Sequence, residues 1–371
     1  MEDLIRNFIV YFTSILYEAM PFVVLGATIA GILEELTPRQ SFAFMMGVSA
    51  FLLTVIFVPR SVVGAAFGPG AVIDPSFLWI KIGAAALLAL AVTASLLQLG
   101  SSIDSALAGI GRWPILAIAA SGLLGLIMPM CECGIVPVIR RLLRKGMPLS
   151  CCTCYLLAGP IVNIVVLLST YMAFAGMEEA VDSSGAPARQ IGGLGMVLLR
   201  GGLGWLVAFV TSLVVLRQYR RYGDELLTPL ARPPQQLAAT DDAPPAPRSL
   251  LQRLGNISET ALHDFVDIMV FLILGALLSA GARIMIPNST FEALSSNAPA
   301  LAILGMMALA IVLCLCSEAD AFLAASLTAL RPAPKLAFLV LGPMMDFKLY
   351  MMYLRVFRPR LIWTIIPCVV V

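Results

Sequence analysis

Apolar positions along the chain come in long blocks rather than in stripes. A water-soluble helix shows polar residues on one face every three to four positions, whereas a bilayer core about 30 Å thick needs roughly 20 apolar residues per helix. Blocks of the second kind cover about residues 8–33, 42–58, 77–99, 113–130, 149–175, 191–216, 262–286, 298–330, 336–352 and 361–371. The pattern predicts an all-α integral membrane protein with about nine or ten hydrophobic segments.

One polar stretch interrupts these blocks. Residues 217–258 are rich in arginine and proline, which is typical of a solvated linker. We therefore expect a first transmembrane half at 1–216 with its motif core at 113–175, the linker at 217–258, and a second half at 259–371 with its motif core at 298–352.

The composition agrees with membrane insertion and limits the kinds of partner to be expected. The chain is 60% hydrophobic and 12% charged, against about 25% charged residues in soluble domains. A net charge of +2 gives no reason to expect a nucleic-acid partner. The expected partners are the lipid bilayer and a small-molecule or ion substrate, with a homo-oligomer or an accessory membrane subunit left open. Most of the eight cysteines lie in apolar segments, which favours free thiols over a disulfide framework.

Clusters of positive charge predict orientation, because short cytoplasmic loops carry an excess of lysine and arginine. We expect a cytoplasmic side for the arginine-rich linker and for Arg140, Arg141, Arg144 and Lys145, and an outside position for the acidic loop 177–188. Arg331 and Lys335 are expected on the cytoplasmic side too, as are Arg355, Arg358 and Arg360. Only one segment separates these two groups, so an intervening segment is expected to be re-entrant or broken.

An internal repeat is the most informative pattern. Cys131 in MPMCECG and Cys314 in LCLCSEAD lie 183 residues apart, and so do Pro160 in LAGPIVN and Pro343 in VLGPMMD. A weaker echo pairs residues 21–31 with residues 267–281. Many transporters are built from such repeats, with the substrate site at broken helices where the halves meet.

Both motifs contain helix breakers. Pro129, Gly134 and Pro137 bracket the first cysteine pair, and Gly-Pro interrupts the segments at 159–160 and 342–343. Proline removes a backbone donor and clashes with the preceding turn. Because an unpaired backbone group is costly in lipid, we expect these breaks to face protein or a water-filled cavity.

The repeated cysteines indicate soft-ligand chemistry. Two cysteines separated by one residue point about 200° apart on an ideal helix, but to the same side of an extended backbone. Two pairs would offer up to four sulfurs, and soft thiolates select Cu(I), Zn(II) and other thiophiles; trivalent arsenic belongs among them by the same argument. The candidate metal ligands are Cys131, Cys133, Cys314 and Cys316. For Cys151, Cys152, Cys154 and Cys368 we expect the ordinary role of a small buried side chain.

Acidic residues inside the repeated elements are a separate signal. Glu132, Glu318, Asp320 and Asp346 lie in otherwise apolar sequence, where ionisable groups are expensive and mark functional sites. Proton coupling through one of them is a working hypothesis, against a structural ion pair. Lys348 is either the partner of Asp346 or a residue near the aqueous boundary.

Four stretches resemble a predicted permease family that includes the YraQ-like proteins and the ArsP organoarsenical efflux permeases. They are Met130–Leu149, Leu157–Asn163, Cys316–Ser326 and Leu341–Arg360. The resemblance implies a multi-pass permease of the bacterial inner membrane, whose characterised relatives export trivalent organoarsenicals or are linked to copper and zinc efflux. This chain differs in having Glu132 between the first two cysteines and no His-rich segment.

Motifs and resemblance together nominate a substrate pathway. Its candidates are Cys131, Glu132, Cys133, Pro137, Pro160, Asn163, Cys314, Cys316, Glu318, Asp320, Pro343, Asp346 and Lys348. The function we expect is secondary transport, most readily export, of a soft, thiophilic solute such as a trivalent organoarsenical or a soft metal ion. Two alternatives stay open: transport of a sulfur-containing or other small anion, and a non-transporting membrane subunit that docks through the linker.

No enzymatic activity or cofactor is expected. The sequence has no G-x-x-x-x-G-K-[ST] loop, so nucleotide hydrolysis is not predicted, and no catalytic triad is visible. A soft metal or metalloid is expected only as cargo.

Overall fold

A computed structural model describes residues 2–35, 47, 86–87, 113–128, 130–144, 146–175, 191–229, 231, 250–285, 299–327 and 330–370. These residues form helices and contain no strand, apart from one isolated bridge between Leu227 and Phe357. The prediction of an all-α protein is confirmed for this part of the chain. Except at residues 47, 86 and 87, the predicted segments 42–58 and 77–99 lie outside the described residues, as do Pro129 and Lys145.

Before the linker, two long helices flank four short ones. They are α1 (Glu2–Glu35), α6 (Pro114–Ile127), α7 (Glu132–Arg144), α8 (Leu149–Ala158), α9 (Ile164–Phe174) and α10 (Gly193–Tyr222). A short 3-10 helix, η3 (Gly223–Leu226), continues α10. The residues 193–226 are long and apolar enough to cross a membrane.

The second set has the same character. It consists of α11 (Leu250–Met285), α13 (Pro299–Leu313), α14 (Ser317–Ser326), α15 (Pro332–Leu341), α16 (Phe347–Val356) and α17 (Pro359–Val370). Residues 252–278 form the second described stretch of membrane-spanning length and hydropathy. Both ends of the predicted linker 217–258 are helical, since α10 continues to Tyr222 and α11 begins at Leu250.

The predicted segment 149–175 is two helices rather than one. Helix α8 ends at Ala158, Pro160 lies in the following turn, and α9 begins after Asn163. The segment 336–352 is divided in the same way at Gly342 and Pro343, between α15 and α16. Proline cannot donate the backbone bond that would continue the helix, so each Gly-Pro pair ends one helix and lets another begin.

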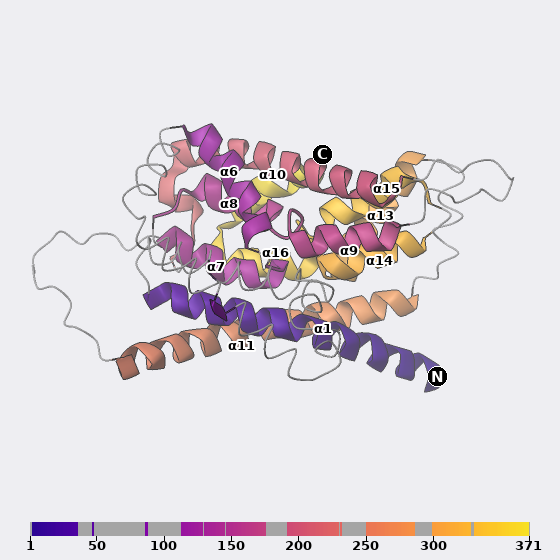
Figure 1. Cartoon of the computed structure of the whole chain (residues 1–371), viewed down its shortest axis with the longest axis horizontal. Helices are drawn as coiled ribbons and strands as arrows, with labels where there is room; N and C mark the ends of the chain where they lie inside the picture. Colours follow the sequence, from indigo (N-terminus) through magenta and orange to yellow (C-terminus); the bar gives the residue numbers. More distant parts are fainter. Residues whose placement is uncertain are drawn as a thin grey trace, which may run out of the picture.

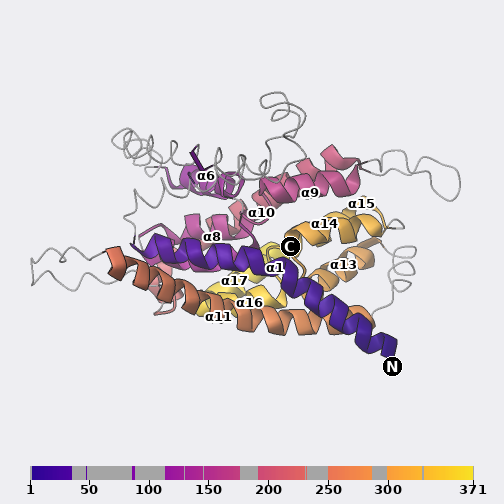
Figure 2. The same cartoon turned by 60° about the horizontal axis from the view of Figure 1, so that its bottom comes forward.

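Helices α1 and α11 pack against each other and cross along one side of the bundle, as Figures 1 and 2 show. Helix α1 also packs against α7. The two backbones approach closely where Gly26 meets Gly134, because a Cβ added at Gly26 would lie 2.6 Å from the Cα of Gly134. Small residues at such crossings let membrane helices pack tightly.

Two contacts between a basic side chain and an aromatic ring mark the two ends of the bundle. Lys335, in the first turn of α15, lies 5.9 Å from the ring of Phe174 at the end of α9. Arg360, at the start of α17, lies 4.6 Å from the ring of Tyr222 at the end of α10. In Figure 1 the end of the bundle at which α9 ends and α15 begins lies opposite the end at which α10 ends.

This arrangement corrects the expected orientation of the basic groups. The charge pattern favoured one side for Arg331 and Lys335 together with Arg355, Arg358 and Arg360, whereas the structure places the two groups at opposite ends of the bundle. The two groups are separated because α15 and α16 together run from one end of the bundle to the other.

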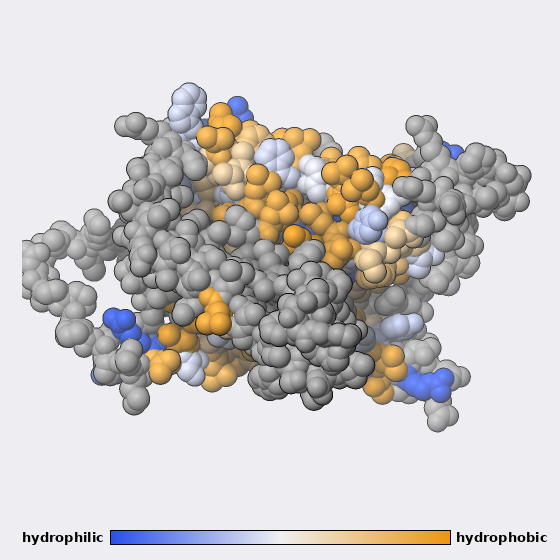
Figure 3. All heavy atoms as spheres, in the orientation of Figure 1, coloured by the Kyte–Doolittle hydropathy of each residue, from blue (hydrophilic) through white to orange (hydrophobic). Residues whose placement is uncertain are grey.

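The outer face over α6, α9 and α10 is apolar. Figure 3 shows hydrophobic side chains covering the part of the surface where these helices lie in Figure 1. Exposed residues there are Trp113, Leu116, Leu123, Met172, Leu194, Leu198 and Leu206. A contiguous apolar face of this kind fits contact with lipid.

Candidate functional site

Helices from both sides of the linker meet at a buried carboxylate. Glu132, the first residue of α7, is 1% exposed, and its Oε1 lies 3.2 Å from Nζ of Lys348 in α16. Its Oε2 accepts a hydrogen bond of 3.2 Å from Oγ of Ser317, the first residue of α14. Both carboxylate oxygens are therefore held by partners from the second set of helices.

A second carboxylate shares the lysine. Asp346 precedes α16, and its Oδ1 accepts a 2.5 Å hydrogen bond from the backbone N–H of Leu349, so it caps this helix. Its Oδ2 lies 3.6 Å from Nζ of Lys348. One buried ammonium group thus faces two buried carboxylates.

Arg200 forms the other charged centre of the site. It lies inside the apolar helix α10 with 0% exposure. Its Nη1 donates to Oγ1 of Thr170 at 2.6 Å, and its Nη2 donates to the backbone carbonyl of Ser317 at 2.9 Å. The carboxylates of Asp320 and Glu318 in α14 attract it electrostatically.

Asp320, like Asp346, has a buried carboxylate oxygen that accepts no hydrogen bond from the described residues. In Asp320 this atom is Oδ2, which would lie 2.9 Å from a Cβ added at Gly342. A larger residue at the Gly-Pro break would therefore collide with it. Three buried carboxylates (Glu132, Asp320 and Asp346) face two buried cations (Lys348 and Arg200).

These five residues form a charged cluster, and the repeated cysteines border it. The thiols of Cys131 and Cys133 lie close to each other, and Cys133 and Cys314 both interact electrostatically with Lys348. Cys314 has a φ of 47°, in the left-handed region that costs an L-residue roughly 1–2 kcal/mol. Cys316 precedes α14 and is half-buried.

Among the described residues, no three histidine, cysteine or carboxylate side chains are arranged to hold a metal ion. The predicted metal site of Cys131, Cys133, Cys314 and Cys316 remains a prediction about a state that carries cargo.

The remaining candidates shape the backbone. Pro160 and Pro343 are buried in the turns after α8 and α15, and Pro137 is buried within α7. Asn163 caps α9 by accepting from the N–H of Val165 at 2.9 Å, and its Nδ2 donates to the carbonyl of Met130 at 3.4 Å. Asn163 therefore connects the break between α8 and α9 to the break between α6 and α7.

Sequence reasoning missed Arg200, Ser317 and Thr170. Arg200 carried a usable signal, because an arginine inside the apolar run VLLRGGLG is expensive in a membrane and needs a partner. Ser317 and Thr170 carried none, since hydroxyl side chains are common in membrane helices and only the fold brings these two to Glu132 and Arg200.

Comparison with known proteins agrees with the resemblance seen in the motifs. The profile of the family ArsP_1, described as "Predicted permease", matches residues 77–371. The "UPF0718 protein YcgR" of Bacillus subtilis (strain 168) is 34% identical over 261 residues, which are 69% of this chain and 78% of that protein.

A second relative comes from Streptococcus mutans serotype c (strain ATCC 700610 / UA159). It is named "Putative two-component membrane permease complex subunit" and is 31% identical over 239 residues, 64% of this chain and 71% of that protein. No solved structure matches the chain. The apolar helices and the family match together identify a membrane protein, and the chain belongs to the predicted permease family.

Proposed function

We propose that this chain is a secondary-type permease that exports a small, soft, thiophilic solute through the site between its two halves. One observation carries the proposal. The pairs Cys131/Cys133 and Cys314/Cys316 lie at helix breaks around the Glu132–Lys348 ion pair. Thiols beside broken helices can replace the solvation shell of a soft solute such as a trivalent organoarsenical or a soft metal ion.

Helix boundaries support the proposal of two related halves. Leu149–Ala158 and Pro332–Leu341 are each ten residues long and start 183 residues apart. The caps Asn163 and Asp346 have the same separation. The pair α8–α9 and the pair α15–α16 run in opposite directions between the two ends of the bundle (Figure 1), which favours inverted rather than parallel repeats.

Charge supports an orientation in the bacterial inner membrane. The end of the bundle that holds Tyr222 carries the basic residues Arg140, Arg141, Arg144, Arg220, Arg221, Arg355, Arg358 and Arg360. Under the positive-inside rule this end, with the linker, faces the cytoplasm.

The charge balance favours a cationic solute or proton coupling. The three buried carboxylates exceed the two buried cations by one negative charge. An unpaired buried charge is costly, so a proton or a positively charged solute at the site would neutralise it. Two thiol pairs complete a site for a polarisable solute.

Tolerance of a sensitive bacterial host tests this function. Expression of the chain is expected to raise tolerance to at least one of a trivalent organoarsenical, arsenite, copper or zinc, and a Cys131→Ser/Cys133→Ser variant is expected to lose the gain. The matched control is Cys151→Ser/Cys152→Ser, which changes two buried thiols in α8 away from the charged cluster. The soft-cargo proposal fails if no agent is tolerated better, or if both double variants behave alike.

A small anion is the second candidate cargo. Helices α7, α14 and α16 all begin at the cluster, and helix N-termini attract negative charge. Uptake of a sulfur-containing anion by liposomes that hold the purified chain, with soft metal present and absent, separates the two cargo classes.

A role as one subunit of a larger permease is the third candidate, favoured by the name of the Streptococcus relative. The linker is its natural docking segment. Deletion of residues 232–249 is the sharper test, because it spares Leu226 and Thr228, which hydrogen-bond to the turn after α16. Loss of a co-purifying membrane subunit with unchanged helix content would support this role.

A further inference from the structure

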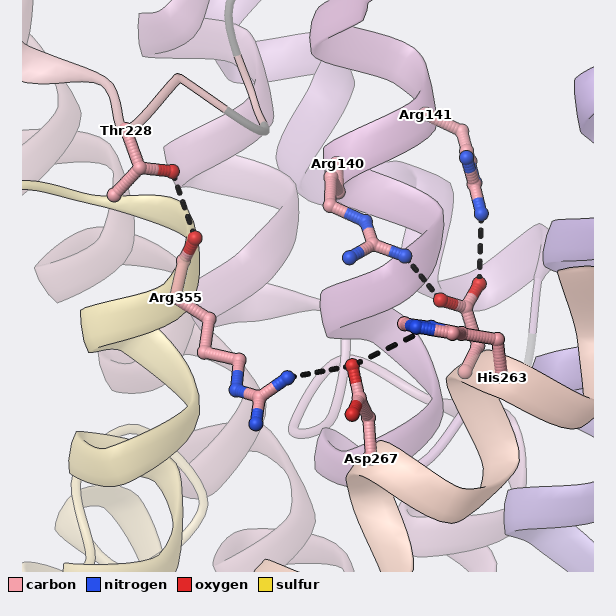
Figure 4. Close-up of polar contacts among 7 residues, drawn as sticks. Arg140, Arg141, Thr228, His263, Asp267 and Arg355 are labelled. Atoms are coloured by element: carbon pink, nitrogen blue, oxygen red, sulfur yellow. Dashed lines mark hydrogen bonds and ion pairs between the residues drawn. The ribbon is translucent and has the colours of Figure 1, made fainter.

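A network of ion pairs joins three helices at the end of the bundle that carries the linker (Figure 4). Asp264 of α11 accepts from Nη2 of Arg140 and, at 3.1 Å, from Nη2 of Arg141, both in α7. The side chain of Asp264 is 2% exposed. This inner part of the network therefore clamps α11 to α7 through a buried carboxylate.

The outer part of the network reaches solvent. Asp267 of α11 lies 2.6 Å from Nη1 of Arg355 in α16 and 3.6 Å from Nδ1 of His263. Exposure of the side chains rises outward, from 24% for Asp267 to 46% for Arg355 and 71% for His263. Arg355 also lies over the ring of Phe271 at 5.1 Å. The network thus extends from the surface into the protein.

A small, partly open cavity lies among these ion pairs and is lined in part by Arg140, Asp264, Asp267 and Arg355. Its volume is about 40 Å³, enough for about two or three water molecules but too small for a bound solute. Its walls come from the same three helices, with Val136 and Pro137 from α7, Ile268 and Phe271 from α11, and Met352 from α16.

Helix α11 continues from this cavity to the charged cluster. Gly275 of α11 lies against the side chain of Lys348, since a Cβ added there would be 3.2 Å from the lysine Cβ. Asp267 and Gly275 are eight residues apart on one helix, which corresponds to about 12 Å. The cavity-lining residues Ile268 and Phe271 fall between them.

We infer that this network, formed by Arg140, Arg141, Asp264, Asp267 and Arg355, is the gate on the linker side of the solute pathway, and that it is closed in this structure. Parting α11 from α7 and α16 would break every ion pair of the network and would enlarge the cavity into an opening to Lys348. Pro137 supports this motion, because it removes a hydrogen bond from α7 beside the cavity.

The gate is tested by labelling position 352 with a membrane-impermeant methanethiosulfonate, using the full chain with Met352→Cys in inside-out membrane vesicles and peptide-resolved mass spectrometry. Asp267→Arg and Arg355→Asp are each expected to raise the labelling rate by a factor of up to about five, which corresponds to the loss of one partly exposed ion pair. The charge-swapped double variant restores the pair and is expected to return the rate toward that of the parent chain.

The control is Glu259→Gln, which removes an exposed carboxylate of α11 outside the network. If the reversed-charge chains do not accumulate in the membrane, Asp267→Asn and Arg355→Gln replace them with the same expected direction. Unchanged labelling in the single variants, no recovery in the swap, or an increase only from the opposite membrane face would overturn the inference. The proposal of a gate rests on the proposed permease function. Because the labelling needs no cargo, failure of the gate can be distinguished from failure of the permease function.

Discussion

At the residue scale, the site depends on one lysine shared by two carboxylates. Lys348 lies 3.2 Å from Glu132 and 3.6 Å from Asp346, and all three side chains are buried. Charges without water are tolerated only when they are paired. Replacing one of these charged residues is therefore expected to destabilise the chain more than replacing two residues of opposite charge together.

Lys348→Met is expected to destabilise the chain by about 3–5 kcal/mol, because it leaves Glu132 and Asp346 buried without their cation. The double change Glu132→Gln/Lys348→Met removes one of the two orphaned charges and should recover part of the loss. Thermal unfolding of the purified chain in detergent measures both. A double variant no more stable than the single one would contradict the pairing.

Thr170→Val is expected to cost about 1–3 kcal/mol, because it leaves a buried Arg200 donor without its acceptor. The matched control is Thr364→Val, whose hydroxyl bonds to its own helix in an exposed position and whose loss should be nearly neutral. Comparison of the melting temperatures of the two variants measures how much the bond between Thr170 and Arg200 contributes. Equal losses would mean that the Arg200 bond contributes nothing.

Part of this site could be predicted from the sequence. Glu132, Asp320 and Asp346 stand out because carboxylates are rare in apolar segments, and the pairing of Lys348 with Asp346 was one of the two roles expected for this lysine. The nearer partner of Lys348, Glu132, lies 216 residues away in the sequence, and no local pattern encodes such a contact. Residue types indicate that a charge needs a partner, whereas only the fold selects it.

At the element scale, breaks and close approaches define the bundle. The two Gly-Pro pairs in the sequence predicted the ends of α8 and α15, because proline ends a helix locally by lacking a backbone N–H donor. The ends of α10 and α11 were not predictable in the same way. Arginine is a good helix former, so the polar run after residue 216 did not show that the helix continues to Tyr222.

Gly26→Ala is expected to destabilise the chain by separating α1 from α7, since its methyl group would lie 2.6 Å from the Cα of Gly134. Overpacking of this kind typically costs about 1–3 kcal/mol. The control Gly202→Ala changes a helical glycine with open space around it and should be neutral or stabilising by up to about 1 kcal/mol. Thermal unfolding of both variants measures the difference. If the two glycines respond alike, the close approach of α1 to α7 is wrong.

At the scale of the whole molecule, the direction of the helices determines which charges share a membrane side. The broken pair α15–α16 takes the chain from the Lys335 end to the Arg355 end. Charge clusters alone predicted one side for both groups, because a sequence does not show whether two short helices form a hairpin or a crossing.

Cysteine substitution at Arg331 and at Arg358 tests this topology. Position 331 is expected to react with an impermeant thiol reagent from outside the cell, and position 358 only in inside-out vesicles. Reaction of both positions from the same face would refute the crossing of α15–α16. Labelling of each position before and after membrane permeabilisation gives the control for access.

The central claim is that a soft solute passes through the site where the two cysteine pairs meet the Glu132–Lys348 ion pair. The most direct measurement is efflux of a trivalent methylated arsenical from liposomes that hold the purified full chain. The account predicts efflux above that of empty liposomes, its loss in Cys131→Ser/Cys133→Ser, and its retention in Cys151→Ser/Cys152→Ser. Efflux that the first double variant supports as well as the parent chain would contradict it.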